Sequence, residues 1–259
     1  MAKIVIAAHK PYWMPSDSLY LPVHVGAANS DTQLDFQRDD EGENISALNP
    51  RYSELTALYW AWKNLQDEDA VGLAHYRRHF AGSGDKPPAG KRGVLSGAEA
   101  TEMLERSPII LPKKRMYYIE TVGAHYAHTF DSAHLDILRD VLGELSPASL
   151  PAYANVLSAR GAHIFNMMLM RRDLFDEYCS WLFPILFEVE KRLDFEGMTP
   201  FEARVVGRLS ERQMDTWLQT EGNAYVECPV ISTEKTNWLK KGGGFLAAKF
   251  FGRRYTESF

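Results

Sequence analysis

Cysteine is scarce in this chain, with Cys179 and Cys228 as the two in 259 residues. Two cysteines do not provide the disulfide framework of small secreted domains, and they favour a chain that folds in a reducing compartment. Long apolar runs are also absent. None approaches the roughly 20 residues that a helix needs to cross a bilayer, and the opening MAKIVIAA is too short for a signal peptide. We therefore expect a cytoplasmic protein, soluble or bound peripherally to a membrane.

An excess of positive charge is missing too. Lys and Arg number 29 against 34 Asp and Glu, which gives a formal net charge of -5. Nucleic-acid-binding domains are usually basic, so this balance argues against a nucleic acid as partner. The content of apolar (45%) and charged (24%) residues is that of an ordinary globular protein, long enough for one large domain or two small ones.

The segment from residue 42 to residue 80 is the most informative part of the sequence. Apolar residues recur at helical spacing over 55–65, and AVGLA at 70–74 is a short apolar run typical of a buried strand. Four polar side chains follow that strand: His75, Tyr76, Arg77 and Arg78. In open α/β sheets ligands bind beyond the carboxyl ends of the strands, so these residues are predicted to form a site.

Further elements follow from apolar spacing and from turn residues. Apolar runs predict strands at 3–8, 22–27, 108–112 and 224–231. Helical periodicity predicts helices at 98–106, 132–145, 174–191 and 210–220. Pro184 is expected to kink or split the third of these helices, and Ser210 to be the N-cap of the fourth. Gly, Pro and Ser predict a long flexible loop at 81–97 and a break at 146–153.

Four blocks of the sequence resemble a known family. They are GENISALNPRYSELTALYWAWKN (42–64), VGLAHYRRHF (71–80), FNMMLMRRDLFDEYCSWLFPILFEVE (165–190) and RVVGRLSERQMDTWL (204–218). In order and spacing they are similar to the signature blocks of a bacterial capsular polysaccharide and exopolysaccharide synthesis family, which includes galactofuranosyltransferase domains of O-antigen assembly. The resemblance extends over roughly residues 3–231, and blocks of this length are more specific than a short motif.

The resemblance implies an α/β fold of the GT-A type, with a Rossmann-like mixed sheet flanked by helices. It implies a single domain over 1–236, with a nucleotide-sugar half at about 1–112 and an acceptor half at about 113–236. The implied activity is transfer of galactofuranose from UDP-galactofuranose, with inversion, to a glycan on a lipid carrier at the inner face of the cell membrane. Residues alone indicate a nucleotide-binding α/β protein.

The end of the strand at 70–74 departs from the usual GT-A pattern. Such enzymes usually have an Asp-x-Asp pair there, which holds a divalent cation across the diphosphate, whereas this chain has His75-Tyr76-Arg77-Arg78. Two guanidinium groups can bind phosphate oxygens and neutralise the leaving UDP. We therefore expect Arg77 and Arg78 to contact the diphosphate or the sugar. Mn or Mg is possible as a cofactor but is not supported by this motif, and no metal ligand is assigned.

The remaining donor-binding candidates lie on two loops. The resemblance suggests that the polar residues before the helix bind uridine and ribose: Asn44, Ser46, Asn49 and Glu54. Asn44 and Ser46 are equally good turn formers and Asn49 an N-cap, while Glu54 lies among large apolar residues and favours a buried partner. His9 and Lys10 follow the first strand and are candidates for the uracil and first phosphate, although a solvated lysine is as plausible.

An inverting transferase needs a general base for the acceptor hydroxyl, usually a carboxylate. Related GT-A enzymes place it at the start of a helix in the second half, where Glu211 stands here. Glu211 is thus the predicted catalytic base, Arg208 a predicted positioning or sugar-binding residue, and Asp173 and Asp215 weaker alternatives. A glutamate in a first helical turn can also simply complement the helix dipole.

The strand-like run at 163–170 provides two candidates for hydrogen bonds to sugar hydroxyls, His163 and Asn166. A histidine beside apolar residues is as often a satisfied core residue. The tail at 237–259 combines aromatic side chains with Lys and Arg, which suggests an interfacial segment on anionic lipid or a packed C-terminal helix.

Two further functions remain open from the sequence. The chain could use another UDP-hexose as donor, or it could be a non-catalytic nucleotide-sugar-binding protein in which the missing Asp-x-Asp pair is a real loss. An RNA-binding module is disfavoured by the acidic total charge. The oligomeric state is not indicated.

Overall fold

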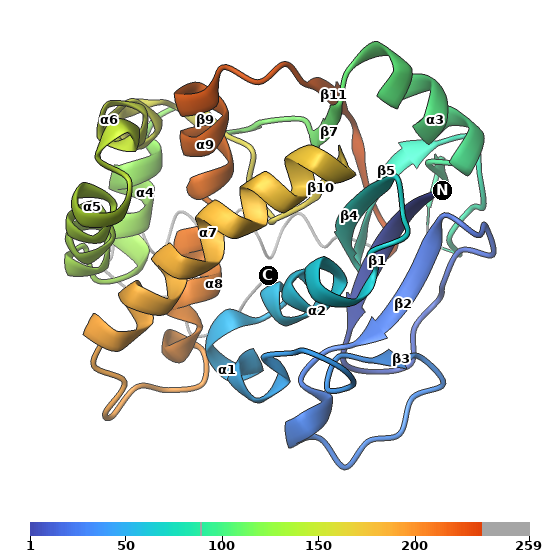
Figure 1. Ribbon diagram of the computed structural model, residues 1–259, viewed down its shortest axis with the longest axis horizontal. Helices are drawn as coiled ribbons and strands as arrows, with labels where there is room; N and C mark the ends of the chain where they lie inside the picture. Colours follow the sequence, from blue (N-terminus) through green and yellow to red (C-terminus); the bar gives the residue numbers. More distant parts are fainter. Residues whose placement is uncertain (89, 235–259) are drawn as a thin grey trace.

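The computed structural model describes residues 1–88 and 90–234, which form a mixed α/β fold (Figure 1). Ten of the described strands make one sheet, whose main order is β11-β7-β10-β4-β1-β2-β3. These strands are β1 (Ala2–Ala8), β2 (Tyr20–His24), β3 (Gln37–Arg38), β4 (Ala70–His75), β7 (Ile109–Pro112), β10 (Met168–Arg171) and β11 (Val226–Cys228). β1 is parallel to β2 and β4, whereas β10 runs antiparallel to β4 and β7.

A hairpin follows β4 directly. β5 (Arg78–Gly82) pairs with β4 through His75 and Arg78, and on its other side with β12 (Val230–Ser232) and β6 (Gly93–Val94). The loop predicted over 81–97 therefore contains strand pairing, and the Asp85 carboxylate accepts hydrogen bonds from the N–H and Oγ of Ser16. Sequence patterns do not predict this strand pairing, because a two-residue strand such as β6 is too short to show periodicity. A second, two-stranded sheet joins β8 (Arg115–Met116) to β9 (Gly161–Ala162).

Helices cover both faces of the main sheet. α2 (Leu55–Asn64) and α7 (Arg172–Arg192) contact β4 on one face, and α3 (Gly97–Arg106) contacts β1 and β7 on the other. Alternate residues of β1 divide between two apolar cores, Val5 and Ala7 facing one and Ile4 and Ile6 the other. This period of two explains why β1 reads as a continuous apolar run, since both of its faces are buried.

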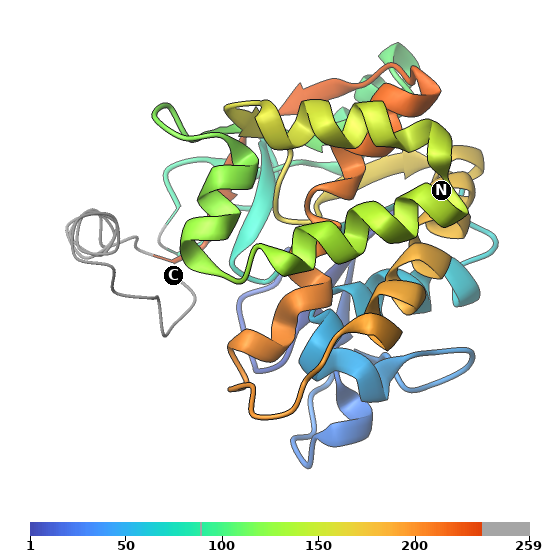
Figure 2. The same cartoon turned by 90° about the vertical axis from the view of Figure 1, so that its left-hand side faces the viewer.

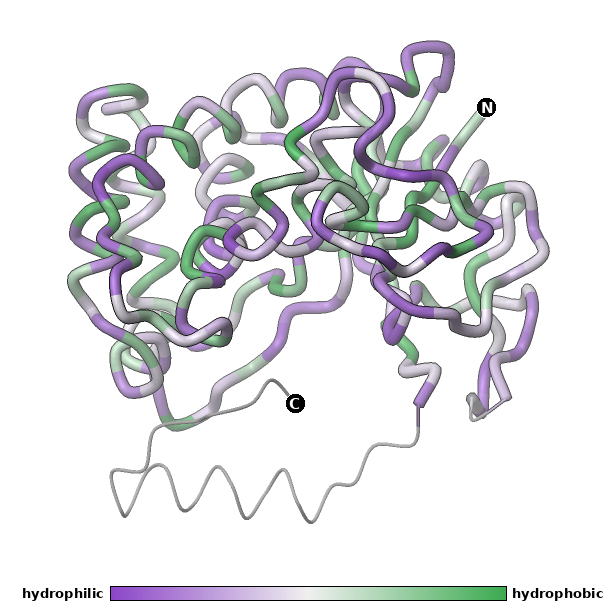
Figure 3. The backbone as a smooth tube through the Cα atoms, turned by 90° about the horizontal axis from the view of Figure 1, so that it is seen from below, coloured by the Kyte–Doolittle hydropathy of each residue, from purple (hydrophilic) through white to green (hydrophobic). Residues whose placement is uncertain are grey.

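The remaining helices gather at one end of the molecule, to the left in Figure 1. They are α4 (Val122–Thr129), α5 (Ala133–Leu145), α6 (Leu150–Ser158), α8 (Val205–Ser210) and α9 (Gln213–Glu221). The connecting segments include α1 (Asn49–Tyr52) and the 3-10 turns η1 (Ala27–Asn29), η2 (Ser46–Leu48), η3 (Pro147–Ser149) and η4 (Glu202–Arg204). α7 joins the two ends, because it contacts β4 and β10 as well as α5 and α8. Figure 3 shows apolar colour concentrated in the central strands and hydrophilic colour in many peripheral loops.

Three predicted boundaries are wrong. The break at 146–153 contains η3 and the start of α6, because prolines at the first turn of each start a helix rather than end one. Ser210 ends α8 instead of capping the next helix, which begins at Gln213. The strand predicted at 224–231 is two strands, since Pro229 lacks an N–H and the chain changes partner there from β7 to β5.

Pro184 does not split α7, which continues as one helix to Arg192. The side chain of Pro184 is exposed, while Phe183 and Ile185 beside it are buried in the core. Packing of the residues on both sides of the proline therefore holds the helix together, although Pro184 has no N–H to donate within it. No helix within residues 1–88 and 90–234 combines the length and apolarity needed to span a bilayer. The predicted interfacial tail, 237–259, lies outside the described residues.

Candidate active site

The carboxyl ends of β1 and β4 lie side by side, because these parallel strands pair to their last residues. The residues that follow them meet around the ring of Tyr76. The His9 ring packs edge-on against it with centroids 5.1 Å apart, and Lys10 Nζ lies 5.5 Å from its centroid. The guanidinium of Arg77 lies 5.3 Å from the same centroid. This group, the Tyr76 cluster (His9, Lys10, Tyr76 and Arg77), joins donor-site candidates from two distant segments.

The Tyr76 cluster carries strong positive charge. Burial lowers the pKa of His9, and the charges of Lys10 and Arg204 lower it further. Arg204 belongs to η4 in the second half of the chain, so cationic groups from three elements converge here. Guanidinium and ammonium groups at the carboxyl ends of parallel strands suit a diphosphate, which needs several donors and neutralising charge.

Arg78 follows Arg77 in sequence but contacts different neighbours. Its guanidinium lies 4.5 Å from the centroid of the Phe165 ring. Burial lowers the pKa of Arg78 and the charge of Arg77 lowers it further, while Glu211 and Glu54 act in the opposite direction. Arg78 therefore connects the Tyr76 cluster with a second group of residues. We call this group the central cluster: Glu54, His75, Arg78, Phe165, Asn166 and Glu211.

The loop between β9 and β10 holds the central cluster together. Phe165 and Asn166 have φ angles of 82° and 53°, a region that residues other than glycine rarely adopt. The Phe165 carbonyl contacts His75 Nε2, and its N–H donates to Glu211 Oε1 at 3.3 Å. Strained backbone of this kind persists where its surroundings fix it, and it is frequent at functional sites.

The Asn166 side chain is buried and bonded at both ends. Its Nδ2 donates to Glu54 Oε1 at 2.7 Å and to the Gly207 carbonyl at 3.1 Å, and its Oδ1 accepts from Ser210 Oγ at 2.8 Å. Glu54 Oε1 also lies 4.0 Å from His75 Nε2. Glu54, at the start of α2, thus has a buried amide as partner. With its amide occupied in this way, Asn166 fixes the loop and the Glu54 carboxylate.

Glu211 directly follows α8 and keeps contact with solvent. Its side chain is 24% exposed, and Oε2 lies 2.9 Å from Nη1 of the buried Arg212. A partly exposed carboxylate near Arg78, oriented by a buried arginine and a backbone N–H, has the features of a general base. Asp173, the alternative candidate for the base, lies near the amino end of β4, at the opposite end of that strand. It is paired with Arg171, which is in register with the first residue of β4.

His163 lies in a buried ionic group. Its Nδ1 is 2.6 Å from Asp215 Oδ1 and its Nε2 3.1 Å from Glu227 Oε1, and its own N–H donates to Asp215 Oδ2. Burial alone would raise the pKa of Asp215, but the hydrogen bond from His163 keeps that pKa low. Lys114 Nζ lies 3.7 Å from the same carboxylate. Both ring nitrogens of His163 are therefore occupied, and its place two residues before Phe165 suggests that it positions the loop.

Arg208 is clamped between two aromatic rings. Its guanidinium lies 4.0 Å from the Phe130 ring centroid and 4.3 Å from that of Phe201. It donates to the carbonyls of Phe201 and Glu202, and burial lowers its pKa to about 10. The same rings line a cavity of about 250 Å³. Its wall also includes Asp131 and His134, and residues of the connection between α7 and α8. Arg208 therefore supports the wall of this cavity.

Residues 3–222 match the family described as a domain of unknown function, DUF4422. The chain belongs to this family. Among solved structures it is similar to the apo form of WbbM, described as a bifunctional glycosyltransferase. The TM-score is 0.82 at 28% sequence identity, covering 90% of this chain and 45% of the other, so the chain spans less than half the length of that protein. No curated protein matches. The predicted α/β, GT-A-like fold is confirmed by this match.

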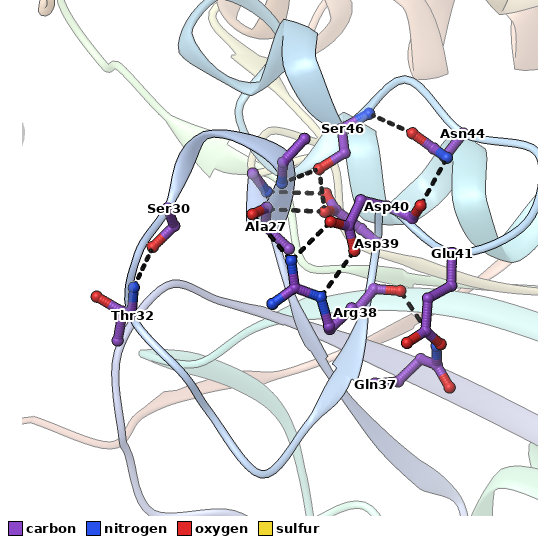
Figure 4. Close-up of polar contacts among 12 residues, drawn as sticks. Ala27, Ser30, Thr32, Gln37, Arg38, Asp39, Asp40, Glu41, Asn44 and Ser46 are labelled. Atoms are coloured by element: carbon purple, nitrogen blue, oxygen red, sulfur yellow. Dashed lines mark hydrogen bonds and ion pairs between the residues drawn. The ribbon is translucent and has the colours of Figure 1, made fainter.

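Two other donor candidates of this DUF4422 chain, Asn44 and Ser46, belong to a separate network, shown in Figure 4. Ser46 Oγ donates to the buried carboxylate of Asp39 and accepts from the Ala28 N–H at 3.1 Å. Asn44 Oδ1 accepts from the Ser46 N–H at 3.1 Å, and its Nδ2 donates to backbone carbonyls. Asn49 Nδ2 donates to the Ser53 carbonyl and to a threonine hydroxyl. Asn44 and Ser46 thus close turns, the alternative role that their residue types suggested. Asn49 is not the N-cap that the sequence suggested, because it is the first residue of α1 and no side-chain cap bond forms there.

Sequence reasoning missed three residues of the site region. Asp39 is a fully buried carboxylate that accepts from two backbone N–H groups. Arg204 acts electrostatically on His9 of the Tyr76 cluster, and Glu227 contacts His163. Both residues come from the last third of the chain. No local pattern marks them, because each acts through a contact with a distant segment. Within the described part of the chain, no three His, Cys, Asp or Glu side chains are grouped so as to hold a metal ion.

Proposed function

We propose that this chain is a glycosyltransferase that moves a hexose from a UDP-sugar to a hydroxyl group of a glycan. The supporting observation is that Lys10 and Arg77 lie against the Tyr76 ring and Arg204 acts on the neighbouring His9. Arg78 is in the electrostatic field of both Arg77 and the partly exposed Glu211 carboxylate. A cationic site for a leaving diphosphate beside a carboxylate that can accept a proton is what glycosyl transfer requires.

In the proposed reaction the acceptor oxygen attacks the anomeric carbon of the donor. Glu211 takes the proton of that hydroxyl, and the bond between the anomeric carbon and the diphosphate oxygen breaks with its electron pair leaving on UDP. Arg77 and Arg78 neutralise the negative charge that develops on the diphosphate. With one carboxylate acting as base and no covalent intermediate, the configuration at the anomeric carbon inverts. Glu54 and His75, which lie next to each other beside Phe165, orient the sugar.

The finer assignment follows the family resemblance. We propose UDP-galactofuranose as the donor and a cell-surface glycan on a lipid carrier as the acceptor, on the cytoplasmic face of the membrane. The cavity beside Arg208 supports an acceptor in this half of the chain. Aromatic rings and carboxylates, such as those of Phe130, Phe201 and Asp131, are groups that pack on sugar rings and accept from hydroxyls.

The test is a panel of UDP-sugars given to the purified chain, with binding measured by calorimetry and UDP release measured with and without glycan acceptors. We expect UDP release only with donor and acceptor together, and the highest kcat/KM with UDP-galactofuranose. UDP release with a different UDP-hexose, and not with UDP-galactofuranose, would identify that other sugar as the donor. If UDP-sugars bind but no acceptor leads to UDP release, the chain is a nucleotide-sugar-binding protein and the proposal is overturned.

We also propose that the arginines make transfer independent of a divalent cation, or only weakly dependent on it. The measurement is turnover before and after EDTA treatment, followed by addition of Mn²⁺ or Mg²⁺. Activity should persist after EDTA, because guanidinium groups supply the positive charge at the diphosphate. Complete loss of turnover with recovery on adding Mn²⁺ would show that a cation is required.

A further inference from the structure

Exposed apolar side chains concentrate in one short segment. Met116, Tyr118 and Ile119 are 47%, 76% and 60% exposed, within four consecutive residues. The other large exposed apolar side chains of the described residues, Met1, Leu145 and Tyr225, lie apart from one another in the sequence. Single exposed apolar residues are common on protein surfaces, whereas adjacent ones usually mark a contact surface.

The backbone of this segment is held in place. The Tyr117 N–H donates to the Arg160 carbonyl at 2.8 Å, and Arg160 Nη1 donates to the Tyr118 carbonyl at 3.1 Å. Tyr117 itself turns inward, where its ring packs on His125 with centroids 4.3 Å apart. Tyr118 has a φ of 55°, which is unfavourable for an aromatic residue. The structure thus fixes a strained turn that presents Tyr118 to solvent, and Figure 2 shows the segment leading into α4 projecting from the body.

The exposed charges of residues 113–119 are positive, while an exposed carboxylate of β11, Glu227, accepts from the Lys114 N–H at 3.4 Å. Lys113, Arg115 and Arg160 are exposed, whereas Glu120 is 8% exposed and lies within 3.4 Å of His125 Nδ1. Aromatic and aliphatic side chains flanked by Lys and Arg are the combination that binds the interface of an anionic bilayer. We call residues 113–119 the Tyr118 loop.

We propose that the Tyr118 loop docks on an anionic phospholipid bilayer, with Tyr118 and Ile119 entering the headgroup region and Lys113 and Arg115 facing lipid phosphates. The loop lies within electrostatic range of the central cluster, since Arg115 acts on Arg78 and Glu211 on Tyr117. Docking therefore brings the central cluster near the lipid surface. This inference does not depend on the donor sugar or on catalysis.

The test is flotation of the full-length chain with vesicles of phosphatidylcholine alone or mixed with phosphatidylglycerol. The double variant Tyr118→Asn/Ile119→Ser removes the apolar contact, and asparagine tolerates the positive φ of position 118. The matched control is Leu145→Ser, which removes an apolar side chain that is 51% exposed at the end of α5. Lys113→Glu/Arg115→Glu reverses the charge, and thermal unfolding verifies that every variant folds.

We expect the wild-type chain and Leu145→Ser to float with anionic vesicles. The double variant should bind at least about tenfold more weakly, because two side chains no longer leave water. The charge reversal should weaken binding to anionic vesicles while leaving the weak binding to neutral ones unchanged. Wild-type chain that stays unbound, or a double variant that floats like wild type, would overturn the proposal. UDP release with a water-soluble acceptor should not change in the double variant, which separates docking from the proposed activity.

Discussion

Two polar networks lie near the carboxyl ends of the parallel strands, and they differ in how their charges are satisfied. The network around Asp39 is closed: its carboxylate is fully buried and accepts from Gly26, Ala27 and Ser46 (Figure 4). The central cluster is open. Glu54 and Glu211 are 17% and 24% exposed, and two arginines and strained backbone lie beside them.

The difference separates a scaffold from a site. A buried carboxylate whose oxygens already accept several hydrogen bonds has little capacity left for a ligand, and it fixes the loops around it. Partly exposed charges that keep lone pairs and donors toward solvent can exchange water for substrate. Residue type alone does not show this difference, because both networks contain a carboxylate and an asparagine. Three predictions test the separation, starting with the largest expected effect, and a fourth concerns a buried histidine outside both networks.

Glu211→Gln should lower kcat by about 10³-fold, because the acceptor hydroxyl loses its general base. UDP affinity should stay within about threefold, since the amide keeps the shape of the side chain. Steady-state UDP release and calorimetric titration with UDP measure the two effects. The control is Glu105→Gln, an exposed position of α3. Wild-type turnover in Glu211→Gln would remove Glu211 from the chemistry.

Asp39→Asn should lower the free energy of unfolding by about 3 kcal/mol, because an amide NH₂ then faces backbone donors in a buried place. At a temperature where the variant is folded, kcat should equal that of wild type. Urea unfolding and a turnover assay provide the two measurements, with the exposed Asp35→Asn as control. A large loss of kcat at unchanged stability would place Asp39 in the site and remove the distinction between the two networks.

Arg78→Gln should lower kcat/KM by about 10²-fold, because one charged donor is lost where the diphosphate leaves. Arg78→Lys should recover only part of the loss, since an ammonium group keeps the charge without the bidentate geometry. Kinetics with the best donor from the panel measures both, with the exposed Arg106→Gln as control. Equal kinetics in wild type and Arg78→Gln would show that the diphosphate binds elsewhere.

His79 should produce the smallest effect, on stability against pH. It is fully buried between Trp13 and Tyr20, and burial lowers its pKa to about 4. An unfolded histidine titrates near pH 6.5, so between pH 6.5 and 4 the unfolded chain binds more protons and stability falls as pH falls. At pH 5.5 this loss is about 1 kcal/mol relative to pH 8.

The variant His79→Phe removes the titrating group and keeps an aromatic ring in the core. Its unfolding free energy, measured in urea at pH 8 and pH 5.5, should fall by about 1 kcal/mol less than that of wild type. An equal drop in both proteins would assign the pH dependence to other groups. Turnover should be unaffected by the change, because the His79 ring is fully buried against Trp13 and Tyr20.

Much of the sheet could be predicted from the sequence. β1, β4 and α2 were placed within two residues, since their apolar periods are long and both faces of the strands are buried. α6 was missed because Pro147 and Pro151 look like breakers until the chain positions them at helix starts. β11 and β12 were merged, since apolar runs do not reveal which neighbour each half of a run will pair with.

For the candidate site, the sequence indicated the strand ends that carry His9, His75 and Arg78, because polar residues directly after buried strands mark the edge where ligands bind. Local pattern carries that information. Only the tertiary structure decided that Ser46 bonds to the buried Asp39 while Asn44 bonds to Ser46, and that His163 lies between Asp215 and Glu227. The physical reason is that hydrogen bonds and electrostatic fields depend on distance in space, and these partners are brought together by segments far apart in the chain.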